Sequence, residues 1–485
     1  MAESGAERGG GSGQEGHLRP GLKRRHMTMI SIGGVIGAGL FVGSGAILNE
    51  AGPATVLTYL LTGVILVLIM RMLGEMAVAQ PSVGSFSDYG RMALGNWAGF
   101  SIGWLYWYFW VIVVGVEAVA GAGIINKFLP GIPPWVLCLI LIMALTATNL
   151  YSVGSYGEFE FWFAGIKVVA IIAFIILAAL FVIGLWPGGG QGNVAPLYDN
   201  GGFFPNGPLA MFAGIATVIF SFVGAEVVTI AAAESNEPEE GVARATNAVI
   251  WRVLLFYVVS LFFVVSIVPW NSEFTAGTIT SPFAVALQKM GIPGAATVMN
   301  LVVLTAVLSV LNSSLYITSR MLFALTKHKD APQFFLHTTS RGVPIWAILA
   351  GTIVGYVAVL ISYFFPEQVF TWLVNASGAI ALFVYLLVAI SELVMRRRLE
   401  REAPERLRLK MWFYPWLTYL SIVVIAGVLV AMAFISGLRP LLLASVISAI
   451  VIIIAYFIRR AIGPQESDPY QPIREQEAEP TPQTE

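Results

Sequence analysis

Three ionisable residues lie inside apolar stretches of the chain, where they could bind or transfer a proton. Glu117, Lys167 and Glu226 are each surrounded by Val, Ile, Ala, Phe and Gly. An ionisable side chain at the centre of a membrane helix costs about 2.5–3.5 kcal/mol to insert, so each needs a partner, a cavity or a neutral form. Burial disfavours the charged form, which favours proton exchange at these positions. The alternative is a Glu–Lys pair that only holds helices together.

Other charged residues are expected nearer the membrane surface. Their side chains can extend toward water while their stems stay in an apolar environment. These residues are Arg71, Glu75, Glu158 and Glu160.

A glycine-rich stretch precedes the first of these ionisable residues. Four glycines between Gly33 and Gly39 would weaken a helix by roughly 1 kcal/mol each relative to alanine. These glycines are not confined to one face of the helix. This pattern favours a helix that is locally unwound, and the alternative is a packing face of small residues. In an opened helix, freed N–H groups can bind a carboxylate and freed carbonyls can bind an ammonium.

A second interruption is predicted beside Glu226. Gly224 makes a poor helix centre, and the two interrupted stretches are five predicted spans apart. That spacing is typical of an inverted repeat of five plus five helices. We therefore divide the chain into a disordered tail (1–22), two repeats (23–190 and 191–400), two added helices (401–460) and a second disordered tail (461–485).

Two further groups could serve a substrate. Asn312 and Ser313 form a polar patch in an apolar stretch, and could line a cavity or bond to neighbouring helices. The aromatic run from Trp104 to Trp110 could stack on an ammonium. Its position early in a span favours an aromatic belt at the membrane surface instead.

The composition indicates which kind of structural element holds these residues in place. Of 485 residues, 57% are hydrophobic and 11% are charged, against about 25% charged in soluble domains. Soluble, disordered, coiled-coil, collagen-like and nucleic-acid-binding proteins are thereby excluded. Hydropathy predicts an all-α integral membrane protein with twelve transmembrane helices near 30–50, 53–76, 97–126, 132–150, 159–186, 207–233, 246–269, 292–326, 345–365, 369–395, 412–435 and 438–459.

Basic residues predict the orientation. They concentrate before the first span and between spans ten and eleven, where seven lie between Arg396 and Lys410. The positive-inside rule then places both termini in the cytoplasm, which requires an even number of spans. Short loops and the lack of Asn-x-Ser/Thr sites in the outward loops favour a bacterial inner membrane.

Several enzyme classes lack their motifs here. There is no phosphate-binding loop, and no nucleophile stands beside a base. The four histidines lie in tails or loops, without metal-ligand spacing, and one cysteine cannot form an internal disulfide. We expect neither an enzyme nor a metal or cofactor, and no obligatory partner subunit is evident.

Local motifs resemble a known family. The stretch Gly33–Phe41 is similar to the first-helix signature of the amino acid–polyamine–organocation superfamily, and Pro81–Ser87, Tyr156–Trp162 and Phe222–Glu226 resemble its bacterial amino acid transporter branch. Longer stretches, including Gly224–Ser235, are most similar to members that carry 4-aminobutyrate. The resemblance extends from Leu22 to Arg460.

The resemblance implies a LeuT-like fold with broken helices one and six, and proton-driven import of a small zwitterionic amino acid, with 4-aminobutyrate the leading substrate. A permease or exchanger for proline, aromatic or basic amino acids is the alternative. A channel or membrane sensor is the alternative from another class.

The resemblance also implies a site. The backbone from Val35 to Gly39 would receive the substrate's carboxylate and ammonium, Phe220 would form an aromatic gate, and Lys167 would stand where relatives bind sodium. Ala38 replaces a small hydroxyl residue of some relatives, which removes one carboxylate contact. The expected substrate-binding residues are Val35, Ile36, Gly37, Ala38, Gly39, Phe220, Ser221, Phe222, Val223, Gly224, Asn312 and Ser313. The expected proton-coupling residues are Glu117, Lys167 and Glu226.

Overall fold

The computed structural model describes residues 29, 36–82, 86–151, 153–187, 190, 192–226, 238–272, 280–339 and 342–462. Every regular element within these ranges is a helix, which confirms the all-α prediction. Both predicted tails lie outside the described residues, except that the last helix continues to Ile462. The division into two inverted repeats stays a prediction.

The helices of 15 residues or more overlap the predicted spans, and the seventh span, predicted at 246–269, runs through three consecutive elements. These helices are α3 (Thr55–Ala79), α5 (Asn96–Phe128), α6 (Pro134–Tyr151), α7 (Val153–Val182), α8 (Pro208–Phe222), α10 (Pro238–Arg252), α13 (Ala295–Lys327), α14 (Ile345–Phe364), α15 (Val369–Glu402), α16 (Trp416–Phe434) and α17 (Arg439–Ile462). The short elements are η1 (Gly39–Gly43), α2 (Ser44–Ala51), η2 (Gly52–Ala54), α4 (Phe86–Leu94), η3 (Ala195–Leu197), η4 (Val253–Val259), α11 (Ser260–Ile267), α12 (Pro282–Lys289), η5 (Gln333–Leu336) and η6 (Pro404–Arg406).

The described ranges hold ten helical runs that are long and apolar enough to cross a membrane. One of them, Gly39–Ala79, contains two predicted spans. The two spans are separated at Gly52, which has φ +63° and is followed by Pro53. Only glycine adopts that conformation readily. The shorter apolar helix α8 accounts for the remaining span. The protein is therefore a multi-pass membrane protein.

Two predicted spans are interrupted where the glycines predict it. In the first, Ile36 and Gly37 are not helical, and the helix that follows them begins at Ala38, in the middle of the predicted span. In the sixth, α8 ends at Phe222, and Gly224 takes φ +107°. Because a helix end leaves carbonyls without partners, the Tyr257 hydroxyl donates to the carbonyl of Ser221 at 2.9 Å. The continuation of this span lies outside the described residues.

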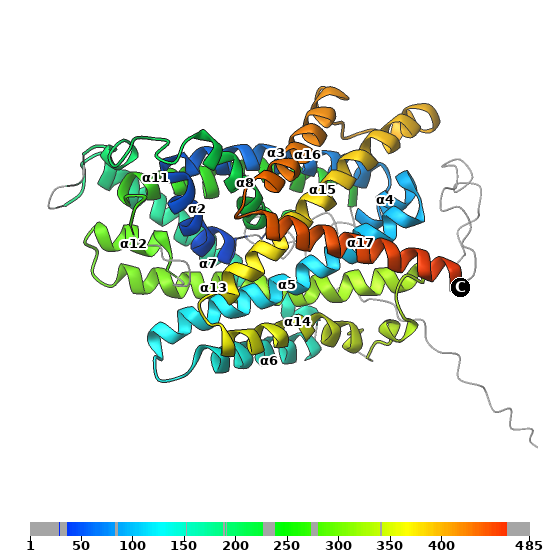
Figure 1. Ribbon diagram of the computed structural model, residues 1–485, viewed down its shortest axis with the longest axis horizontal. Coiled ribbons are helices and arrows are strands. Elements are labelled where there is room, and N and C mark those ends of the chain that lie inside the picture. The colour runs from blue at the N-terminus through cyan, green and yellow to red at the C-terminus, as the bar shows by residue number, and fades with distance from the viewer. Residues whose placement is uncertain are drawn as a thin grey trace, which may run out of the picture.

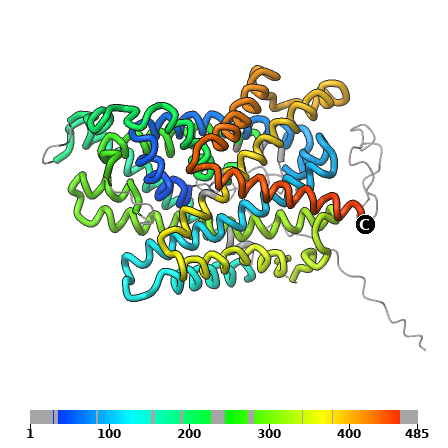
Figure 2. Tube along the Cα trace, in the orientation of Figure 1, coloured from blue at the N-terminus to red at the C-terminus, as the bar shows by residue number. Residues whose placement is uncertain are grey.

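Helix α5 runs through the middle of the bundle. Figure 1 shows α5, α13 and α14 side by side, with α6 along α14, and the same helices are in contact. The other side of α5 contacts α4 and α15. Figure 2 follows the C-terminal helix α17 across the bundle, where it packs on α5 and α15. Helix α5 therefore contacts α4, α6, α13, α14, α15 and α17.

Two short helices were not predicted. Helix α4 follows the second span, and α12 precedes the eighth. Both are too short to cross a membrane and carry charged residues in their turns, Asp88 and Arg91 in α4 and Lys289 in α12. A hydropathy window that selects spans passes over helices of this kind.

Candidate functional site

A small cavity lies where the start of the first helix meets α5, α8 and α13. Its volume of about 10 Å³ has room for roughly one water molecule. It is lined by Gly37, Gly39, Phe109, Trp110, Val113, Glu117, Phe220, Ser221, Val223 and Val310. This volume is too small for an amino acid, which needs the lining elements to separate.

The predicted substrate residues do not all lie at this cavity. Gly37, Gly39, Phe220, Ser221 and Val223 line the cavity. Ile36, Ala38 and Gly224 are next to these residues in the sequence but are not among the lining residues. Phe222 instead packs on the rings of Tyr59 and Tyr257. Asn312 and Ser313 are buried outside the lining, and Val35 lies outside the described residues.

The two glycines of the first helix allow close approach of neighbouring elements. A Cβ at Gly39 would lie 2.7 Å from the Cα of Ser221, and a Cβ at Gly37 would lie 2.8 Å from Oε1 of Glu117. Both are below ordinary van der Waals contact. In the described part of the span, small residues therefore bring the first helix against α8 and α5.

Glu117 of α5 binds the start of the first helix. Its Oε1 and Oε2 accept the backbone N–H of Ala38 at 3.2 and 3.3 Å, and its side chain is buried. The first N–H groups of a helix lack partners within the helix and attract negative charge. Glu117 thus accepts the hydrogen bond from an N–H group that we expected to bind the substrate's carboxylate.

Glu226 joins the interrupted sixth span to two other helices. Its carboxylate accepts the hydroxyls of Tyr106 on α5 and Tyr385 on α15, both at 3.2 Å, and the backbone N–H of Gly224 at 3.0 Å. The residue is fully buried. These donors hold the end of α8 against α5 and α15.

Lys167 contacts a carboxylate that we expected near the membrane surface. Its Nζ donates to Ser309 Oγ at 2.8 Å and lies 3.9 Å from Oε1 of Glu160. The expectation for Glu160 is wrong, because this side chain is fully buried between α7 and α13. The seven-residue separation places both groups on one face of a helix, and this signal was available in the sequence.

The polar patch of α13 bonds to its neighbours. Asn149 of α6 donates to Oδ1 of Asn312 at 2.7 Å, and Ser313 donates to Oε2 of Glu160 at 3.1 Å. These bonds attach α13 to α6 and α7.

The aromatic run of α5 is not a surface belt along its whole length. Tyr106, Phe109 and Trp110 are buried, and the last two line the cavity. The Phe109 and Phe220 ring centroids are 6.3 Å apart. The belt interpretation is therefore wrong for these three residues, because α5 lies in the middle of the bundle.

Glu75 is a second carboxylate that we misplaced. It is buried, with Oε2 2.6 Å from Nη1 of Arg396 and accepting the N–H of Met411 at 2.5 Å. Glu392, which hydropathy did not single out, is also fully buried. Its two carboxylate oxygens make no hydrogen bond of ordinary length within the described ranges. The Thr418 hydroxyl is near enough to interact weakly with this carboxylate.

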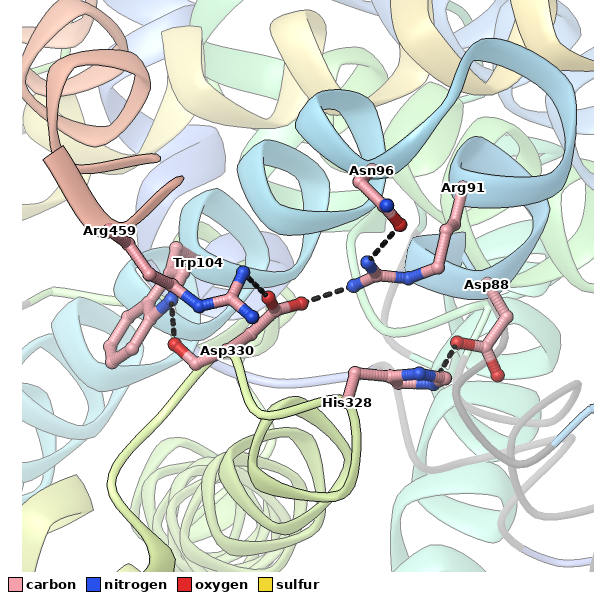
Figure 3. Close-up of polar contacts among 7 residues, drawn as sticks. All are labelled: Asp88, Arg91, Asn96, Trp104, His328, Asp330 and Arg459. Carbon is pink, nitrogen blue, oxygen red and sulfur yellow. Dashed lines mark hydrogen bonds and ion pairs between the residues drawn. The ribbon is translucent and has the colours of Figure 1, made fainter. Parts of the chain in front are cut away.

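A polar cluster lies at the end of α4. Figure 3 shows the carboxylate of Asp330, which follows α13, between Arg91 of α4 and Arg459 of α17. Arg459 lies 2.5 Å from it, and the Asp330 carbonyl accepts the Trp104 indole N–H at 3.2 Å. This single residue therefore ties three elements together.

Beside this cluster, His328 Nε2 lies 2.8 Å from Oδ1 of Asp88. Burial alone would raise the pKa of Asp88. The hydrogen bond and charge of His328, the hydroxyl of Ser82 and the charge of Arg91 outweigh burial and lower that pKa below its ordinary 3.8.

The described ranges contain no group of three or more His, Cys, Asp or Glu residues that could hold a metal ion. The site chemistry that the structure offers consists of carboxylates, one ammonium, hydroxyls and backbone N–H groups. Groups of this kind are able to bind the two ends of a zwitterion, and the carboxylates and the amine are able to exchange protons.

Comparison with known proteins agrees with this architecture. The family described as amino acid permease matches residues 26–465. The gamma-aminobutyric acid permease of Bacillus subtilis (strain 168) is 52% identical over 461 residues, covering 95% of this chain and 97% of that protein. The gamma-aminobutyric acid permease of Escherichia coli (strain K12) is 49% identical over 425 residues, covering 88% and 91%.

A relative with another printed substrate is less similar. The aromatic amino acid transport protein AroP of Corynebacterium glutamicum is 40% identical over 416 residues, covering 86% of this chain and 89% of that protein. The family match spans most of the chain, and these relatives are transport proteins. The chain therefore belongs to the amino acid permease family of the amino acid–polyamine–organocation superfamily.

Proposed function

We propose that this permease is a proton-coupled symporter that imports 4-aminobutyrate across the bacterial inner membrane, with both termini in the cytoplasm. Three relatives that are 49–52% identical are named as permeases, or a probable permease, for this substrate. The basic residues between spans ten and eleven support the orientation.

The observation that carries the proposal is the pair of contacts from the Ala38 N–H to the carboxylate of Glu117. A substrate carboxylate that used this donor would have to displace Glu117. Two carboxylates side by side repel each other, whereas a protonated carboxyl removes this repulsion and is a weaker acceptor. Proton uptake by Glu117 therefore prepares the site for the substrate.

The other end of the substrate is a cation. The rings of Phe109, Trp110 and Phe220 line the same cavity, and the faces of aromatic rings attract ammonium groups. Because the described cavity is too small for an amino acid, the substrate must bind with the start of the first helix and the end of α8 further apart. Binding that differs between the open and closed states drives the conformational change.

The energetics allow accumulation. One proton moving with a neutral zwitterion carries one net charge inward. That charge yields about 2.3 kcal/mol per 100 mV of membrane potential, which corresponds to roughly 50-fold accumulation. A pH gradient adds to this figure.

The test uses the full-length protein in vesicles with an imposed pH gradient or potassium diffusion potential. Uptake of labelled 4-aminobutyrate should follow either gradient and be unaffected when sodium is replaced by choline. Uptake that needs sodium and ignores the proton gradient would contradict the proposal. Vesicles without protein provide the background.

Competition and counterflow separate the alternatives. Stronger competition by proline, aromatic or basic amino acids than by unlabelled 4-aminobutyrate would assign another substrate. Uptake only into vesicles preloaded with amino acid would indicate an exchanger. Currents that do not saturate with substrate would indicate a channel.

A further inference from the structure

Glu160 and Lys167 form a buried charge pair through a bridging hydroxyl. Ser309 Oγ accepts from Lys167 Nζ at 2.8 Å and donates to Glu160 Oε1 at 2.6 Å. Ser313 donates to the other carboxylate oxygen at 3.1 Å. Both charged side chains are fully buried, so neither is exposed to solvent.

Two carboxylates act electrostatically on the ammonium of Lys167. One is Glu160 on the same helix, and the other is Glu117 on α5. Helix α13, which packs against α7, contributes the hydroxyls of Ser309 and Ser313 to this region. Lys167 therefore feels both the carboxylate that caps the first helix and a second carboxylate that does not line the cavity.

The two carboxylates differ in what they contact. Glu117 lines the cavity and accepts the Ala38 N–H, where a substrate can compete. Glu160 is held by hydroxyls of α13 and is not part of the cavity lining. Glu160 can thus balance the charge of Lys167 without meeting the substrate.

We propose that Glu160 is a positioning residue for proton coupling: it holds Lys167 toward α13 and offsets its positive charge, which sets the pH at which Glu117 takes up a proton. This inference rests on the proposed proton symport. Without Glu160, the unpaired ammonium would favour the ionised form of Glu117. Ionised Glu117 keeps the Ala38 N–H from the substrate, so a lower pH would be needed for transport.

The test is the pH profile of 4-aminobutyrate uptake at fixed membrane potential for native protein and Glu160→Gln. We expect the midpoint of Glu160→Gln to move by about 1 pH unit to lower pH. Glu160→Asp, which keeps the charge, should restore most of the native profile. Glu158→Gln is the matched control, because Glu158 lies on the same helix and is only half-buried, and its profile should equal the native one.

Each outcome has a defined meaning. An unchanged midpoint in Glu160→Gln, or an equal shift in Glu158→Gln, would overturn the inference. If Glu160→Gln does not reach the membrane, Ser313→Ala decides, because it removes a donor to Glu160 and keeps the charge of that carboxylate: a smaller acid shift supports the inference, and no shift overturns it. Failure of the proposed function is distinct, because native uptake itself would then ignore the proton gradient.

Discussion

The carboxylate of Glu117 and the backbone N–H of Ala38 are 3.2 and 3.3 Å apart, measured from the two carboxylate oxygens. One side chain of α5 therefore binds the start of the first helix from a distance of 79 residues along the chain. A carboxylate bound to a helix start is a stable arrangement, and the same arrangement would suit a bound amino acid. The competition between these two carboxylates leads to the first prediction.

Glu117→Gln should separate transport from the proton gradient. The amide oxygen can still accept the Ala38 N–H, but the side chain can no longer gain or lose a proton. We expect loss of accumulation driven by an imposed pH gradient, while exchange of labelled for unlabelled substrate persists. Vesicle uptake and counterflow measure the two activities.

A matched control is Glu367→Gln, because Glu367 is exposed in the loop before α15. That variant should accumulate substrate as the native protein does. Retention of gradient-driven accumulation by Glu117→Gln would remove Glu117 from the coupling step.

Lys167→Ala should also lose accumulation, since it removes the buried cation next to Glu117.

Much of the fold could be predicted, because the helices depend on local composition. The span predicted at 345–365 is Ile345–Phe364, and the span predicted at 97–126 is Asn96–Phe128. The interruption of the sixth span was predicted from Gly224, which takes a positive φ that glycine adopts more readily than other residues. Hydropathy and glycine content act within a few residues, so one sequence reveals them.

Partners between distant helices could not be predicted in the same way. Glu160 and Ser309 are 149 residues apart in the chain, and Arg91 and Asp330 are 239 residues apart. Hydropathy averages over a window, so acidic residues near a span end such as Glu75 and Glu160 were placed at the surface. The packing of α13 on α7 and of α15 on α3 buries them.

Gly39→Ala should impair the protein more than Gly37→Ala. The added methyl group would lie 2.7 Å from the backbone Cα of Ser221, whereas at Gly37 it meets the side chains of Val310 and Glu117, which can move. Overpacking of this kind costs about 1–3 kcal/mol. Uptake per amount of purified protein and the thermal unfolding midpoint in detergent measure the effect.

Gly43→Ala is the control on the same helix, because its nearest atom would be the Ala38 carbonyl oxygen at an ordinary 3.7 Å. It should keep native uptake and slightly greater stability, since alanine is the better helix former. Equal loss in all three variants would show that the helix needs glycine for its backbone rather than for close approach.

Asp330→Asn should destabilise the protein more than Arg459→Gln. The Asp330 side chain is fully buried between two arginines, of which Arg91 is 7% exposed and Arg459 is 26% exposed. Removing one partner of a buried ion pair costs about 3–5 kcal/mol, because the remaining charge stays buried. The more exposed Arg459 can be solvated, so its loss should cost less.

Thermal unfolding of the purified variants in detergent tests this order. The expected sequence of midpoints is native, then Arg459→Gln, then Asp330→Asn. A midpoint for Asp330→Asn equal to the native value would show that Arg91 is sufficiently held by Asn96, whose Oδ1 accepts from it at 2.8 Å. It would contradict a structural role for the Asp330 carboxylate.

Asp88 should give the protein a component of stability that is lost in acid. Its pKa in the folded state is below the ordinary value of 3.8, because His328, Ser82 and Arg91 together outweigh the effect of burial. A carboxyl with a lowered pKa stabilises the folded state fully above its unfolded pKa, and this contribution disappears as the pH falls through the folded pKa. Native protein should therefore lose stability below about pH 3.8 faster than Asp88→Asn. The measurement is the unfolding midpoint from about pH 6 to about pH 3. Asp199→Asn, which replaces an exposed carboxyl, is the control and should follow the native curve. If Asp88→Asn followed the native curve as well, the assignment would be contradicted.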